Sequence, residues 1–164
     1  MLRLSPNWAA VEQFFFEGML APGSWVVGAP TPAEGLFGTY RHVYPREDLL
    51  LIDSFVAPDP SQQSAGTTTI WLDRVPIWWM TYNGWHNPTV IDLVKGILRE
   101  TYHSQKFLAG RGETTTSDSK VKGPHYHNTI ERAGFIKFAA EERVVSYSGI
   151  QSLGYYKVSG NSLV

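Results

Sequence analysis

The sequence contains no cysteine, and this absence excludes several kinds of chemistry at once. A chain without thiols forms no disulfide framework, has no thiolate nucleophile and builds no zinc site that needs sulfur ligands. The beginning of the chain, residues 1–6, also lacks the apolar core of a signal peptide. Together these features predict a cytoplasmic protein.

The sequence is also poor in charge. Charged residues make up 18% of the chain, against a usual quarter, and the net charge is -1. Nucleic-acid binding depends on clustered Lys and Arg that neutralise phosphates, so no nucleic-acid partner is expected. No apolar run approaches the roughly 20 residues of a membrane helix, so no membrane partner is expected either.

Motifs that bind nucleotides or activate serine are missing as well. The chain has neither G-x-G-x-x-G nor a phosphate loop ending in G-K-[ST], which argues against nucleotide hydrolysis and a Rossmann cofactor. It has no G-x-S-x-G elbow, and Ser146-Tyr147-Ser148-Gly149 is typical of a hairpin turn. We expect no cofactor, and the sequence alone identifies no reaction.

Aromatic residues, in contrast, are abundant. Six Trp, eight Tyr and eight Phe make up 13% of the 164 residues. This length fits a single domain, residues 1–164, with one hydrophobic core. Aromatic side chains combine a large apolar area with polar tips, so they suit pockets and interfaces.

Two segments show the apolar spacing of helices. The first is residues 7–20, where Pro22-Gly23 then ends the pattern. The second follows Asn87-Pro88, where Asn caps the helix and Pro takes the first turn. Its apolar face comprises Val90, Ile91, Val94, Ile97 and Leu98.

Other segments are rich in β-branched and aromatic residues and predict strands. They are residues 38–43, 49–56, 67–72, 75–82, 125–131, 135–138, 143–147 and 150–158. The short polar link Leu72-Asp73-Arg74-Val75 predicts a hairpin. Residues 57–66 and 105–124 predict loops, and Gly110-Arg111-Gly112 in the second could contact an anion but is too short to indicate a phosphate site.

This order of elements predicts an α+β fold, with an antiparallel sheet and helices packed on one face. Each half of the chain reads as a helix followed by strands that end in a hairpin. The order therefore suggests an αβββ-αβββ pseudo-repeat.

The strand at 75–82 is the main functional clue, because both of its faces are apolar. Side chains alternate along a strand, so Trp78, Met80 and Tyr82 share one face while Ile77 and Trp79 share the other. An open antiparallel sheet usually has one polar face. The second face is therefore expected to be covered by another layer of the domain, by a ligand or by a subunit.

Acid, base and metal chemistry has fewer candidates. Asp53, between apolar neighbours, is the carboxylate best placed to act as an acid or base. His125 and His127 share one side of a strand and could share a proton. A metal would need a third ligand, which could come from His103, His86, Asp53, Glu141 or Glu142. No HExxH-like spacing is present, and we assign no metal.

The order of several motifs resembles an uncharacterised family, the domain of unknown function 5680. The resemblance covers most of the chain and rests on residues 28–32, 51–55, Trp71, 75–84, Phe138, Glu141 or Glu142, and 147–149. The chain departs from the family at Val56-Ala57-Pro58, where the family tends to continue into glycine. Members occur alone or appended to helix-turn-helix regulators, which implies an effector-sensing role. The family has no established catalytic residues, so the resemblance implies none.

Three hypotheses follow. The first is a non-catalytic domain that binds or senses a small molecule in an aromatic-lined pocket; its candidate ligand-binding residues are Trp71, Trp78, Met80, Tyr82, Trp85, Asp53, His125 and His127. The second is a small hydrolase or isomerase that uses Asp53 or the His125 and His127 pair. The third is a homodimer whose interface is the aromatic face, with no small ligand.

Overall fold

The fold is given by a computed structural model that describes residues 5–58, 62–115 and 123–164. The elements in chain order are α1 (Trp8–Leu20), β1 (Thr31–Pro32), β2 (Thr39–Arg46), β3 (Leu49–Val56), β4 (Gln63–Leu72), β5 (Val75–His86), the 3₁₀ turn η1 (Pro88–Val90), α2 (Ile91–His103), β6 (His125–Arg132), β7 (Lys137–Val145) and β8 (Ser152–Ser162). None of the helices in these ranges is long and apolar enough to cross a membrane.

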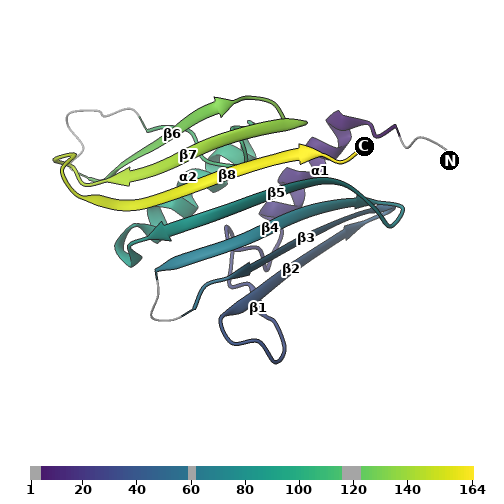
Figure 1. The fold of residues 1–164 in the computed structure, drawn as a ribbon, viewed down its shortest axis with the longest axis horizontal. Coiled ribbons are helices and arrows are strands. Elements are labelled where there is room, and N and C mark those ends of the chain that lie inside the picture. Colours follow the sequence, from purple (N-terminus) through teal and green to yellow (C-terminus); the bar gives the residue numbers. More distant parts are fainter. Residues whose placement is uncertain (1–4, 59–61, 116–122) are drawn as a thin grey trace.

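The eight strands found in these ranges form one antiparallel sheet, with the order β1-β2-β3-β4-β5-β8-β7-β6. Both helices lie on the same face of this sheet, behind it in the view of Figure 1. The strand β8 comes last in the chain but lies in the middle, between β5 and β7 (Figure 1). The expected antiparallel sheet with helices is therefore confirmed.

Local sequence explains where the helices begin. The side chain of Asn7 caps α1 by accepting a hydrogen bond from the Ala10 amide at 3.3 Å. Asn87 does the same at η1, accepting from the Thr89 amide at 3.0 Å, and Pro88 occupies the first turn. The helix predicted for residues 7–20 is confirmed, and the one expected after Asn87-Pro88 is present as η1 and α2.

The hairpin predicted at Leu72-Asp73-Arg74-Val75 is confirmed as the link between β4 and β5. Its two central residues both have left-handed backbones, with φ of 48° at Asp73 and 66° at Arg74. Positive φ at both central positions is the geometry whose twist matches that of the flanking strands. The turn therefore forms without the usual Asn-Gly sequence.

Some predicted boundaries were wrong. Residues 135–138 and 143–147, predicted as two strands, belong mainly to the single strand β7. The strand predicted at 67–72 begins at Gln63, inside the segment predicted as a loop. Residues 59–61 and 116–122 of the two predicted loops lie outside the described residues.

The αβββ-αβββ pseudo-repeat is not confirmed. Within the described residues, five strands, including the two-residue β1, follow α1, whereas three strands follow α2. The second half of the chain does not repeat the first in the number of its strands.

The hydrophobic core lies between the sheet and the helices and is centred on Trp78, which is fully buried. Its indole Nε1 donates a hydrogen bond to the Phe135 carbonyl at 2.7 Å, so its polar atom is satisfied. Its ring stacks on Phe135 at 4.8 Å between centroids and meets Phe15 and Phe138 at 5.5 and 5.6 Å. This aromatic cluster joins α1, β5 and β7.

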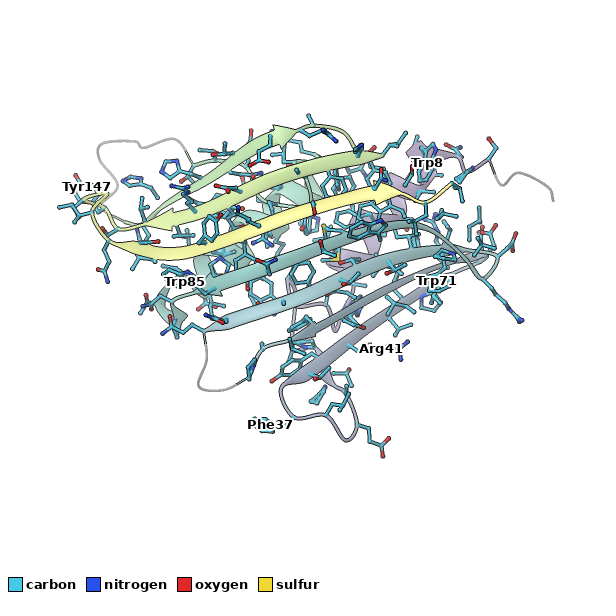
Figure 2. The ribbon with its side chains drawn as sticks, in the orientation of Figure 1. Trp8, Phe37, Arg41, Trp71, Trp85 and Tyr147 are labelled. Carbon is cyan, nitrogen blue, oxygen red and sulfur yellow. The ribbon has the colours of Figure 1, made fainter. Side chains whose placement is uncertain are left out.

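The other face of the sheet carries Trp71, Trp79 and Trp85, each partly exposed. These residues alternate along their strands with the buried Ile70, Met80 and His86. Figure 2 labels Trp71 and Trp85, which lie near opposite ends of the sheet. The expectation that a ligand or a second subunit covers this face stays a prediction.

The core geometry predicts very different costs for two neighbouring substitutions. Trp78→Ala removes a fully buried side chain and should lower the free energy of unfolding by about 3–5 kcal/mol. Trp79→Ala changes the same residue type on the outer face and should cost about 1 kcal/mol. Urea unfolding followed by circular dichroism measures both values. Equal losses would contradict this assignment of the core.

Candidate functional site

A cavity lies on the inner side of the sheet, between the strands β3, β4, β5 and β8 and the segments that cover them. The space between atoms measures about 510 Å³ only when its opening to solvent is counted, and the enclosed part is much smaller. It is lined by Met19, Trp25, Val26, Asp53, Phe55, Ser64, Met80, Tyr82, His86, Leu98, Tyr102, Gly110, Arg111 and Tyr156. Apolar walls with a few convergent polar groups are typical of small-molecule sites.

Asp53 is placed in this cavity by the alternation of β3, in which Leu51, Asp53 and Phe55 all point inward. Its side chain is 2% exposed. Thr68, its cross-strand neighbour on β4, donates a hydrogen bond to Oδ1 at 2.8 Å. The Tyr82 hydroxyl donates to the same oxygen at 2.7 Å.

Gly66 makes the contact between Tyr82 and Asp53 possible. It lies on β4 between Phe55 of β3 and Tyr82 of β5. A Cβ atom at this position would lie 2.5 Å from the Tyr82 hydroxyl and 2.6 Å from the Phe55 Cβ. The absence of a side chain therefore leaves the space through which Tyr82 reaches the carboxylate.

The environment of Asp53 opposes its ionisation. Burial raises the pKa of Asp53 above its ordinary value, and hydrogen bonds from Tyr82 and Thr68 and the charge of His42 only partly offset that effect. His42 is the cross-strand partner of Asp53 on β2, and its Nε2 is 2.9 Å from the Gly18 carbonyl. A buried carboxylate with a raised pKa is a common property of binding and catalytic sites.

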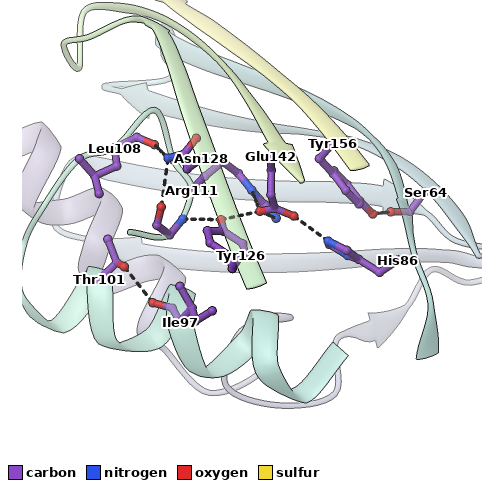
Figure 3. Close-up of polar contacts among 12 residues, drawn as sticks. Ser64, His86, Ile97, Thr101, Leu108, Arg111, Tyr126, Asn128, Glu142 and Tyr156 are labelled. Carbon is purple, nitrogen blue, oxygen red and sulfur yellow. Dashed lines mark hydrogen bonds and ion pairs between the residues drawn. The ribbon is translucent and has the colours of Figure 1, made fainter. Parts of the chain in front are cut away.

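A second buried carboxylate, Glu142, organises the other end of the site (Figure 3). It lies on β7 and is 0% exposed. Its Oε1 is 2.6 Å from His86 Nε2 of β5. Its Oε2 accepts a hydrogen bond from Arg111 Nε at 2.5 Å and one from the Tyr126 hydroxyl at 2.6 Å.

Glu142 is ionised in the folded protein despite its burial. Burial alone would raise its pKa, but the Arg111 charge, the His86 hydrogen bond and charge, and the Tyr126 hydroxyl outweigh that effect. The pKa of Glu142 falls to about 2. Glu142 in turn raises the pKa of the Arg111 guanidinium against the effect of burial. The two side chains form a fully charged, buried ion pair.

Aromatic stacking holds the charged groups against the cavity wall. The Tyr156 ring of β8 stacks on His86 at 4.5 Å between centroids. The guanidinium carbon of Arg111 lies 5.1 Å from the centre of the same Tyr156 ring. The Tyr156 hydroxyl also bonds Ser64 of β4, so this one residue links three groups of the cavity lining.

Arg111 comes from the segment after α2, which a set of hydrogen bonds fixes in place. The Tyr102 hydroxyl donates to the Gly110 carbonyl at 2.7 Å. The Gly112 amide donates to the Tyr126 hydroxyl at 2.9 Å. Gly110 has a φ of 68° and would place a Cβ 2.4 Å from the sulfur of Met80, so glycine is required there.

The structure brings together three of the candidate ligand-binding residues named from the sequence. Asp53, Met80 and Tyr82 line the cavity. Trp78 shares their face of the sheet but is packed in the aromatic core. Trp71 and Trp85 lie on the opposite face of the sheet, away from the cavity.

His125 and His127 also point away from the cavity. Their rings are 6.4 Å apart on one side of β6, as the alternation predicted, and the His125 ring stacks on Tyr147 at 6.0 Å. The residue between them, Tyr126, is the one that points inward to Glu142. Within residues 5–58, 62–115 and 123–164, no three His, Asp or Glu side chains are grouped as a metal site would require.

Sequence reasoning missed most of the charged end of the site. Arg111 was considered only as a weak anion contact, while His86 and Glu142 were named only as possible metal ligands. Tyr126 and Tyr156 were not singled out. The sequence does contain a pattern that indicates Glu142: it falls in the alternating series Phe138, Ala140 and Val144, whose other members are apolar and buried.

Comparison with family models, with curated proteins and with solved structures finds no match to this chain. The resemblance to the domain of unknown function 5680 therefore stays a prediction. The residues of the cavity are the basis for any functional assignment.

The ion pair at Glu142 predicts a specific stability profile at low pH. Because the pKa of Glu142 is lowered from 4.5 to about 2, its ionisation contributes stability that is complete above pH 4.5 and lost as the pH falls to about 2. Glu142→Gln should lower the free energy of unfolding at neutral pH by about 3–5 kcal/mol, because Arg111 loses its partner. The difference in free energy of unfolding between wild type and Glu142→Gln should become smaller below pH 4.5.

Urea unfolding at a series of pH values measures this difference in free energy of unfolding. Glu141→Gln is the matched control, since Glu141 is the neighbouring residue on the outer face of β7. If the difference between wild type and Glu142→Gln stays constant down to pH 2, Glu142 is not the ionised partner of Arg111.

Proposed function

We propose that this protein is a non-catalytic domain that binds or senses a small molecule, and that the ligand lies in the cavity beneath the sheet. The supporting observation is the convergence of Asp53, His86 and Arg111 on one cavity whose remaining walls are mainly apolar and aromatic. Their side chains come from two strands and from the segment after α2. Chain segments far apart in sequence thus meet at this point.

The energetics of the site support the same proposal. Burying a charge or polar group costs free energy even when partners are found, and apolar replacements of similar volume are often as stable or more so. Packing alone therefore does not explain a buried carboxylate, guanidinium and imidazole on one cavity lining, with a second buried carboxylate, Glu142, bonded to two of them. Proteins usually keep such unfavourable burial of charged groups only at functional sites.

The resemblance to the domain of unknown function 5680 is consistent with this proposal. Members of that family are found appended to helix-turn-helix regulators, an arrangement that would suit effector sensing. The cavity in this chain would then be the effector site.

A thermal-shift screen against a metabolite library tests the proposal. A ligand that binds only the folded state raises the melting temperature by an amount that saturates with concentration. Leu98→Phe adds volume at the cavity wall on α2 and should abolish the shift for a true cavity ligand. Leu93→Phe is the matched control, because Leu93 lies on the same helix outside the cavity lining.

Two results would contradict the proposal. One is a library in which no compound produces a saturable shift. The other is a hit whose shift is the same in wild type and in folded Leu98→Phe protein, because that ligand would bind elsewhere. The melting temperature of each variant without ligand establishes that it is folded.

A second candidate is an enzyme, a hydrolase or isomerase, that uses Asp53 as acid or base. The observation in its favour is that burial raises the pKa of Asp53 while Tyr82 holds the carboxylate in place. The His125 and His127 pair is less favoured, because both side chains point away from the cavity. Mass spectrometry of each hit after incubation distinguishes this candidate: turnover lost in Asp53→Asn supports it, and an unchanged compound supports binding alone.

A further inference from the structure

We propose that the ligand of this cavity is a small organic cation, whose protonated amine binds the Asp53 carboxylate. This inference rests on the proposed function, since it names the chemical class of that ligand. It depends on three features: the free hydrogen-bonding capacity of Asp53, the balance of charge around it, and the aromatic side chains beside it.

Asp53 is only partly satisfied by its protein neighbours. Both hydrogen bonds that the described residues donate to it, from Thr68 and Tyr82, go to Oδ1. Oδ2 therefore retains its capacity to accept from another donor. Because the residue is 2% exposed and lines the cavity, that donor would have to reach it through the cavity.

The charge of Asp53 is not balanced by a lysine or arginine. Across the described ranges, no Lys or Arg side chain forms an ion pair with this carboxylate. The charge of His42 of β2 acts on Asp53 directly, and Asp53 in turn acts on Tyr82 of β5 and Tyr102 of α2. Tyr156 of β8 and Arg111 act on Tyr82, the tyrosine that donates to Asp53. Of these, Arg111 alone carries a permanent positive charge.

Arg111 does not make the cavity a site for anions. Its guanidinium is already neutralised by Glu142, which lies against it and is ionised. Asp53, when ionised, therefore has no Lys or Arg partner of its own, and the cationic group that acts on it is the His42 imidazole behind the strand. A ligand ammonium would pair with the Asp53 carboxylate, whereas a ligand carboxylate would add a third negative group near Glu142 and Asp53.

The walls near Asp53 suit the rest of such a ligand. Phe55, Tyr82 and Tyr102 supply aromatic surfaces, which attract an ammonium electrostatically as well as burying apolar area. Met80 and Leu98 complete an apolar side. Amines with a small ring or branched apolar body therefore match this lining better than highly polar compounds do.

A series of three compounds that share one ring tests the charge preference: benzylamine, benzyl alcohol and benzoate. Binding to wild-type protein is measured by NMR titration and by thermal shift. Benzylamine should bind most tightly, and Asp53→Asn should weaken it on the order of 100-fold, because a buried charge pair is lost. The affinity for benzyl alcohol should change little in the same variant.

Asp48→Asn is the matched control, since it makes the same substitution in the exposed turn between β2 and β3. It should leave the affinity for benzylamine unchanged. Asp53→Asn should fold normally because asparagine keeps an oxygen to accept from Thr68 and Tyr82, and its melting temperature checks this.

The pH dependence of binding gives a readout that altered packing would not produce. The affinity for benzylamine should rise as the pH rises through the pKa of Asp53, because the ionised carboxylate binds the amine and the amine stays protonated throughout this range. The affinity for benzyl alcohol should stay flat. Asp53→Asn should remove the pH dependence.

The outcomes separate this inference from the proposed function. If benzylamine does not bind, or if benzoate or benzyl alcohol binds as tightly, the cationic class is wrong while the cavity can still be the ligand site. If the compounds bind wild type and Leu98→Phe equally, the cavity assignment itself fails. Binding of benzylamine that is lost in Asp53→Asn and in Leu98→Phe, but kept in Asp48→Asn and Leu93→Phe, supports both.

Discussion

The rest of the site depends on one constraint, the burial of the Glu142 charge beneath the sheet. A fully buried carboxylate is tolerated only when charged and hydrogen-bonding groups surround it. Here those groups come from Arg111, His86 and Tyr126, which lie on different segments of the chain. Satisfying this carboxylate therefore fixes the segment after α2 against β5, β6 and β7, and with it one side of the cavity.

The inner face of the sheet divides into two regions with different physical roles. Around Trp78 it is a dry aromatic core in which the polar atom of the indole has its own partner. Around Asp53, Tyr82 and Tyr156 it is a polar lining with room beside it. Close packing in the first region supplies stability that can offset the unfavourable burial of charge in the second.

The sequence predicted well what depends on local pattern. Helix 7–20, the strand at 49–56 and the hairpin after Leu72 follow from periodicity and turn chemistry, and alternation placed Tyr82 beside Met80. The same alternation excludes Trp85 from their face, because it lies an odd number of positions, seven, after Trp78. Alternation does not reveal which face is inner, so His125 and His127 were named although Tyr126 points inward.

The charged end of the site was harder to predict because its partners are distant in sequence. The two strands predicted in this region left out residues 139–142, and this break concealed that Glu142 belongs to the apolar face of β7. Arg111 lies in an irregular segment with no periodicity to orient it. Only the assembled sheet brings these residues together.

The central position of β8 has a consequence for how the protein folds. Trp78 of β5 pairs with Ser162, so the sheet closes through contacts between residues that are far apart in the chain. The hairpins from β2 to β5 and from β6 to β7 can form early, but β8 must be synthesised before it can join them. Such non-local pairing slows folding and leaves strand edges open until it is complete. The edges of β5 and β7 that face each other in the sheet therefore stay unpaired until β8 fills the space between them.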